Sequence, residues 1–153
     1  MPLSHRIPFV PTVQAAQYVS GNSIGGLLKL TIERGILTDF TIDSASGQTP
    51  TITAYLFGSM PQGVGTNITD KAAMMLAESD VNRLICAPIA LTLAAPTGSS
   101  ATFASVANLG LPFHNVDGSL APSLLYVVLI SGSTFTPGSV SADFAMNFGV
   151  DAD

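Results

Sequence analysis

Apolar residues recur at every second position along much of this chain, which is the spacing of a β-strand with one buried face. The alternation is clear at residues 28–32, 40–43 and 52–57. It is clearest near the end of the chain, where polar or small residues separate Val140, Ala142, Phe144, Met146 and Phe148. These four segments are therefore expected to be strands.

Two further segments, 84–93 and 124–130, are apolar at nearly every position, as in strands that are buried on both faces. Pro88 cannot donate a ladder hydrogen bond, so its strand needs an edge position or a bulge. Weaker strands are expected at 102–109 and 13–19. Turn-forming residues separate these segments at 21–22, 33–35, 46–48, 96–98, 117–118 and 136–138.

About eight short strands with such turns predict an all-β fold, an antiparallel, jelly-roll-like β-sandwich. One region favours helix instead, because Thr69 and Asp70 are N-cap candidates and a second turn can open at Ser79. We expect one or two short helical turns around residues 69–83. The domain organisation expected is an extended N-terminal arm over residues 1–12 and a single β-sandwich domain over residues 13–153.

Composition adds a prediction about surface. Of the 153 residues, 47% are hydrophobic and 10% are charged, whereas about a quarter of an ordinary soluble domain is charged. Such a surface is typical of a protein that other protein covers, so we expect a homo-oligomer, a trimer first and a dimer next.

Charge and apolar run lengths exclude other partners. The five Lys and Arg residues are scattered and the formal net charge is −5, so no nucleic-acid binding is expected. The longest apolar run is shorter than a membrane span of about 20 residues, and no signal peptide is visible. We expect synthesis in the cytoplasm and no association with a membrane.

Motifs that suggest catalysis have simpler interpretations. Gly21–Gly25 matches the G-x-S-x-G of a nucleophile elbow, and His114 follows it, but the next residues alternate as a strand and supply no helix N-terminus. An esterase built on Ser23 is therefore disfavoured. His5 and His114 have no carboxylate or cysteine at ligand spacing, so both are expected at a surface or interface. The sequence predicts no catalytic, metal or cofactor site, and the protein is not expected to be an enzyme.

The remaining reactive side chains also have structural interpretations. The near pairs Asp39 with Asp43 and Glu78 with Asp80 are interpreted as solvated carboxylates. The single cysteine, Cys86, excludes an intrachain disulfide and is expected to be an inert core thiol.

The run from Tyr18 to Leu28 resembles the Y-x-x-G-x-x-x-G-G-L-L opening of a group of small tailed-bacteriophage virion proteins. Similar features follow in the same order: Tyr55-Leu56-Phe57 before Pro61, the stretch 69–73, Ser79-Asp80 before Leu84-Ile85, and 125–130. The resemblance covers residues 13–150. It implies a virion structural protein of the capsid decoration, or cement, type, located on the capsid surface, where it binds the major capsid protein and stabilises the head.

Two functions remain open. The alternative to decoration is a tail- or fibre-associated carbohydrate-binding module, which the lack of Trp and the 7% aromatic content disfavour. In the decoration model Met1–Pro11 is the segment that grips the shell, because its prolines hold it extended and deny it ladder hydrogen bonds. A frayed terminus that contacts nothing is the simpler alternative. The expected partner-binding residues are Leu3, His5, Arg6, Ile7, Phe9 and Val10.

Overall fold

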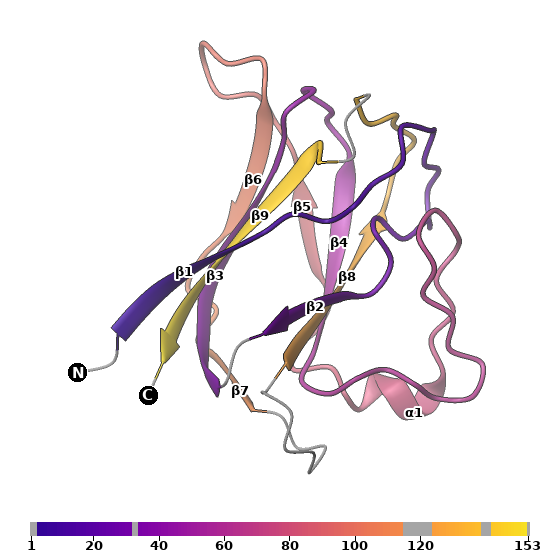
Figure 1. The fold of residues 1–153 in the computed structure, drawn as a ribbon, viewed down its shortest axis with the longest axis vertical. Coiled ribbons are helices and arrows are strands. Elements are labelled where there is room, and N and C mark those ends of the chain that lie inside the picture. Colours follow the sequence, from indigo (N-terminus) through magenta and orange to yellow (C-terminus); the bar gives the residue numbers. More distant parts are fainter. Residues whose placement is uncertain (1–2, 32–33, 115–123, 139–141, 153) are drawn as a thin grey trace.

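Two antiparallel sheets pack face to face in the computed structural model, which describes residues 3–31, 34–114, 124–138 and 142–152 (Figure 1). The five-stranded sheet has the order β1 (Leu3–Phe9), β9 (Phe144–Ala152), β3 (Arg34–Ser44) and β6 (Thr102–Val106), with β7 (Leu111–His114) also paired to β3. The four-stranded sheet has the order β2 (Leu28–Thr31), β8 (Leu124–Ser131), β4 (Thr51–Phe57) and β5 (Ile89–Thr92).

The strand pairing is nested. Apart from β7, the first strand pairs with the last, the second with the second-last, and so on inward: β1 with β9, β2 with β8, β3 with β6, and β4 with β5. A long antiparallel ribbon folded over on itself gives this arrangement, which is that of a jelly roll. The predicted all-β, antiparallel, jelly-roll-like sandwich is confirmed.

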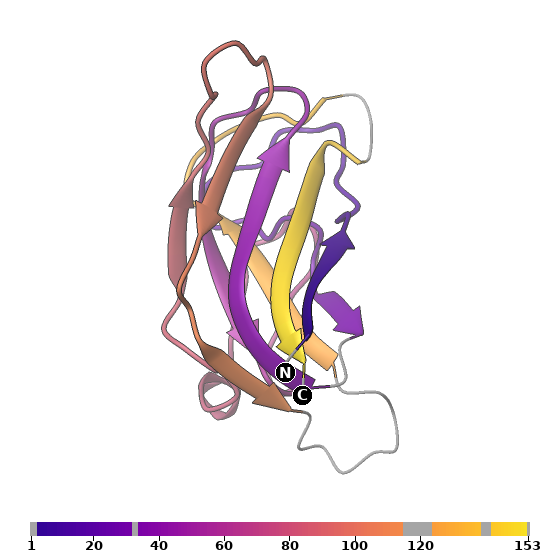
Figure 2. The same cartoon turned by 90° about the vertical axis from the view of Figure 1, so that its left-hand side faces the viewer.

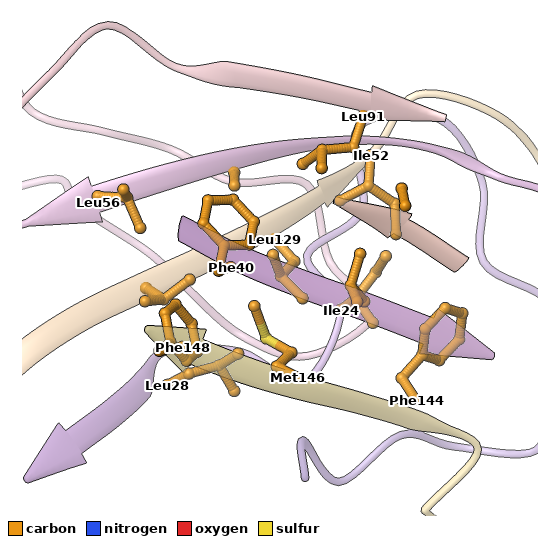
Figure 3. Close-up of a cluster of buried hydrophobic side chains, with 14 of the residues drawn as sticks. Ile24, Leu28, Phe40, Ile52, Leu56, Leu91, Leu129, Phe144, Met146 and Phe148 are labelled. Carbon is orange, nitrogen blue, oxygen red and sulfur yellow. The ribbon is translucent and has the colours of Figure 1, made fainter. Parts of the chain in front are cut away.

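The alternating apolar residues fill the space between the sheets (Figure 3). Phe40 from β3 and Phe148 from β9 stack with ring centroids 5.6 Å apart. Ile52 from β4 and Leu129 from β8 meet them from the other sheet, and all four side chains are fully buried. Burying one side chain of this kind contributes about 1.5–3 kcal/mol, so the period-two pattern supplies the main stabilisation of the sandwich.

Strand positions follow the sequence pattern most closely in the sheet interiors. The strands expected at 52–57 and 124–130 are present as β4 and β8. Of the segment 84–93 only β5 is a strand, and it lies at a sheet edge directly after Pro88, as the proline requires. The strand expected at 13–19 is reduced to a single bridge between Tyr18 and Phe135.

One helical turn is present, α1 (Glu78–Val81), within the predicted region. The expected turn after Thr69 is wrong. Lys71 has a left-handed φ of 62°, and Asn67 and Met75 exchange two backbone hydrogen bonds of 2.8 and 3.0 Å. These contacts close residues 67–75 into a hairpin-like loop in place of a helix, because tertiary pairing outweighs the weak helix preference of a short run.

The N-terminal segment differs from the expected arm. Residues Leu3–Phe9 form β1, which pairs with β9 in continuous register from Leu3 opposite Ala152 to Phe9 opposite Met146. The expectation that prolines would exclude this segment from a ladder is therefore wrong. Because β1 has a neighbour on one side only, Pro8 can face away from the ladder.

No helix in the described ranges is long and apolar enough to cross a membrane.

Candidate assembly surface

One long edge of the sandwich is built from a stretch without any charged residue or histidine. Residues 84–113 contain no Asp, Glu, Lys, Arg or His, and they supply β5, β6 and all of β7 except its last residue, His114. β5 and β6 are the outermost strands of their sheets and lie side by side (Figure 2). Ala94 and Phe103 join the two sheets there through backbone hydrogen bonds of 3.1 and 3.0 Å. We call residues 84–113 the uncharged edge.

The position of this stretch distinguishes it from the other uncharged parts of the chain. Residues 44–69 and 118–142 also lack charge, but their strands β4 and β8 lie inside a sheet. Edge strands usually carry charged side chains, because these prevent pairing with other molecules. The uncharged edge lacks that protection.

The surface of the uncharged edge is apolar and hollowed. Phe103 leaves 46% of its surface exposed, and every residue from Ala94 to Ser100 is exposed. A hollow of about 410 Å³ lies between β5 and β6, lined by residues that include Ala90, Thr92 and Phe103. Exposed aromatic rings and apolar hollows are common in protein contact surfaces, so this edge is a candidate for one.

The charged side chains lie elsewhere. At the opposite edge, β1 and β2 are outermost and present the exposed side chains of His5, Arg6 and Lys29. The two long edges of the sandwich are thus chemically different.

The six residues expected to bind a partner do not form one exposed group. His5, Arg6 and Val10 are exposed, and Val10 leaves 52% of its surface in solvent. Ile7 and Phe9 are half-buried and pack against the core of their own chain. The side chain of Leu3 lies outside the described residues. The apolar anchors of β1 therefore attach it to its own sandwich.

Asp39 is not a freely solvated carboxylate. It accepts a hydrogen bond of 2.9 Å from Thr38 Oγ1 and forms an ion pair with Arg6 of β1. Asp43 is half-buried on the same strand, and burial, together with the nearby charge of Asp143, raises its pKa. The interpretation of these two acids as simple surface charges is therefore incomplete.

Asp80 was expected to be solvated but is fully buried in α1. Its carboxylate accepts hydrogen bonds from Gln62 N at 3.1 Å, Gly63 N at 2.8 Å and Thr66 Oγ1, and it forms an ion pair of 3.1 Å with Arg83 Nε. Burial alone raises the pKa of Asp80, but these hydrogen bonds and the Arg83 charge outweigh it and hold the pKa below its usual value. Asp80 fixes the loop of residues 62–66 to α1.

Ser23 is not presented as a nucleophile. It is fully buried, its hydroxyl donates to Thr69 O at 2.8 Å, and its backbone N–H donates to Ala72 O at 2.9 Å. The G-x-S-x-G motif thus connects two irregular segments of the sandwich. The side chain of His114, the other expected member of such a site, lies outside the described residues.

A second carboxylate contact, made by the half-buried Asp70, lies beside this motif. The Tyr18 hydroxyl donates to Asp70 Oδ1 at 2.8 Å, and Gly25 N donates to the same oxygen at 2.7 Å. Burial first, and then the Asp70 carboxylate, raises the pKa of Tyr18 to about 12. This contact is structural, since it ties residues 18–25 to the segment around Asp70.

Among the described residues, no group of three or more His, Cys, Asp or Glu side chains is placed to hold a metal ion. Cys86 is half-buried, and burial raises the pKa of its thiol. A raised pKa keeps the thiol protonated and poorly nucleophilic, in agreement with the expected inert role.

The sequence signal for the uncharged edge was present but incomplete. An uncharged run at 84–113 can be seen in the sequence, yet 44–69 and 118–142 look similar. Only the strand order shows that the first run forms two sheet edges.

Comparisons with known proteins give distant likenesses to viral particles. The chain is similar to turnip yellow mosaic virus (TM-score 0.32, 9% identity, 99% of this chain and 95% of that chain). It is also similar to a Kashmir bee virus native virion (0.31, 10%, 100% and 70%) and to a heated full particle of Israeli acute paralysis virus (0.29, 9%, 98% and 69%). At these TM-scores the likenesses carry no argument, so the fold assignment rests on the strand pairing.

No family model matches the chain, and no curated protein matches it. The resemblance of residues 13–150 to tailed-phage virion proteins therefore stays a prediction.

Proposed function

We propose that this chain is a virion structural protein that decorates a bacteriophage head, oligomerising and binding the major capsid protein as a cement protein. The uncharged edge is the observation that carries this proposal. The jelly roll occurs in viral capsid proteins, lectins and cupins, so the fold alone does not determine the function. A charge-free sheet edge with an exposed Phe103 favours an assembly subunit, because interface cores are depleted in charge.

The partner at the uncharged edge is a second copy of this chain. Two copies with a net charge of −5 each repel one another. That repulsion is weak where neither copy presents a charge, and residues 84–113 are the uncharged stretch whose strands β5 and β6 form sheet edges. A partner of opposite charge would gain more by contacting the acidic residues elsewhere. A trimer is our first expectation and a dimer the next.

The opposite edge then faces the shell. His5 and Val10 are exposed on or beside β1, and with Leu3 they are the residues that we propose contact the major capsid protein, whereas Arg6 pairs with Asp39 on the outer face of the sheet. Ile7 and Phe9 hold β1 in place from beneath, since both pack against the core. One edge makes contacts between copies, and the other makes contacts with the capsid.

Sedimentation velocity on two matched variants tests the contact between copies. Phe103→Asp places a charge in the uncharged edge, and Val64→Asp places the same charge at a side chain that is fully exposed elsewhere. We expect the wild type and Val64→Asp to sediment as the same oligomer and Phe103→Asp as a folded monomer. A wild-type monomer at micromolar concentration, or an intact Phe103→Asp oligomer, contradicts the proposal.

Co-sedimentation with capsids of the same virus tests the contact with the shell. His5→Ala with Val10→Ala removes exposed side chains and leaves the β1 pairing intact. We expect at least tenfold weaker decoration. Unchanged decoration would show that β1 does not contact the shell. Deletion of residues 1–11 is a poorer test, because it removes a whole strand from the sheet.

A further inference from the structure

The outer face of the five-stranded sheet carries a polar hollow of about 600 Å³. It is lined by Arg6 from β1, by Thr38, Asp39 and Thr41 from β3, and by the segment 105–110 without Leu109. We call it the polar groove. Figure 2 shows the outer face of this sheet turned towards the viewer. The volume of the groove falls within the range of about 300–1,000 Å³ that small-molecule sites occupy.

The strand pairing explains why the groove exists. On one side, β3 pairs with β7 over Arg34–Leu37 and with β6 over Phe40–Ser44. On its other side, the register of β3 with β9 shifts between Leu37 and Asp39. The connection between β6 and β7 crosses this shift, where Leu109 N donates to Thr38 O at 2.9 Å. The groove opens between this connection and β1.

The lining offers both donors and acceptors at zero net charge. The Asp39 carboxylate uses one site for Arg6 and one for Thr38, so further acceptor sites remain. Arg6 is exposed and has further N–H donors. Within the described ranges, the hydroxyls of Thr41 and Ser105 and the amide of Asn108 have no hydrogen-bond partner.

This inventory selects a class of ligand. The Arg6–Asp39 pair cancels its own charge, so neither an anion nor a cation gains a net attraction. A ligand with many hydroxyl groups matches the lining, since each hydroxyl donates one hydrogen bond and accepts others. Val106 and Ala107 supply the apolar contact. We propose that the polar groove binds one or two rings of a neutral carbohydrate.

The lining residues include no aromatic ring, and this limits the affinity of the groove for a sugar. Without a ring to stack on the sugar, a single groove is expected to have a dissociation constant on the order of 1 mM. An oligomer that presents several grooves on one particle would bind a glycan-covered surface far more tightly through multivalency.

Two-dimensional NMR of the full chain, titrated with methyl glycosides of glucose, galactose, mannose and N-acetylglucosamine, tests the proposal. Thr41→Val keeps the shape of a β-branched strand residue and removes the hydroxyl. Asn108→Gly removes the amide at a residue with φ of 58°, which glycine adopts without strain. Thr53→Val is the control, since Thr53 lies half-buried in the other sheet.

We expect at least one glycoside to shift the amides of Thr41, Ser105 and Asn108 saturably. Either groove variant should weaken that binding at least tenfold, and Thr53→Val should leave it unchanged. The proposal is overturned if none of the four sugars shifts these amides, if the shifts survive both groove variants, or if methyl glucuronide binds more tightly than every neutral sugar. Phe103→Asp should keep the groove intact, so failure of the oligomer and failure of sugar binding are separate results.

Discussion

Arg6 on β1 and Asp39 on β3 form an ion pair across the intervening strand β9, passing directly over Gly149. Gly149 is the register partner of both residues, Arg6 on one side and Asp39 on the other. Partly exposed ion pairs contribute only about 0–1 kcal/mol. The pair nevertheless connects the edge strand β1 to β3, on the far side of β9. Because the ion pair passes over β9, the residue of β9 beneath it must be a glycine.

Gly149→Ala should therefore destabilise the protein. A Cβ at this position would lie 2.9 Å from Arg6 Nη1 and closer still to the Asp39 carboxylate. We expect a loss of about 1–3 kcal/mol, the range of overpacked positions, measured by urea denaturation. In an Asp39→Ala background the same substitution should cost much less. Equal losses in both backgrounds would show that the ion pair is not the obstacle.

Asp80→Asn should be among the most destabilising polar substitutions in the chain. The substitution removes the negative charge that pairs with Arg83. It also replaces one acceptor oxygen by an NH₂ group, which cannot accept the hydrogen bonds that Gln62 N and Gly63 N donate. We expect a loss of about 3–5 kcal/mol at neutral pH. Glu78→Gln on the same short helix is the control, because Glu78 is exposed, and it should change stability by less than about 0.5 kcal/mol.

The pH dependence of that loss has a defined sign. The folded pKa of Asp80 is lowered, so its stabilisation is present above the unfolded pKa of about 3.9 and disappears as pH falls through the folded value. The difference between wild type and Asp80→Asn should therefore shrink in acid. A difference that stays constant from neutral pH to pH 2 would be inconsistent with a charged role.

Tyr18→Phe should remove the hydroxyl that joins Gln14 to Asp70, at a loss of about 1–2 kcal/mol. Tyr55→Phe is the control, because the Tyr55 hydroxyl has no hydrogen-bond partner in the part of the chain that the structure describes. Since the folded pKa of Tyr18 is about 12, wild-type stability should fall as pH rises from about 10 towards 12. Thermal unfolding of Tyr18→Phe should show a flatter alkaline decline, and an equally steep one would refute the assignment.

Asp43→Asn should stabilise the protein at neutral pH by less than about 1 kcal/mol. Burial and the Asp143 charge raise the pKa of Asp43, so its ionisation opposes folding above that pKa. The gain should become small at pH 3, where Asp43 is mostly protonated in both the folded and the unfolded chain. Thermal melts of the two proteins at pH 7 and pH 3 provide the comparison.

Period-two spacing predicts interior strands well, because a half-buried strand must alternate. It fails for β1 and β7, which carry Pro8 and Pro112, since a proline is tolerated at an edge and only the fold determines which strands are edges. The groove is harder still to predict. It depends on Gly149 lying opposite Arg6 and Asp39, and on the register shift between β3 and β9 after Leu37. Each of these registers depends on two strands that are far apart in the sequence, so no single segment predicts it.

Nested pairing also determines the order in which the molecule can be completed during synthesis. β1 must wait for β9, which is made last among the described strands, and such long sequence separation slows folding. The uncharged edge at 84–113 leaves the ribosome earlier, while β3 still lacks β9 beside it. A chain that stops before residue 144 lacks β9, so it exposes the uncharged edge together with an unpaired side of β3. Such a chain should aggregate in place of forming ordered particles.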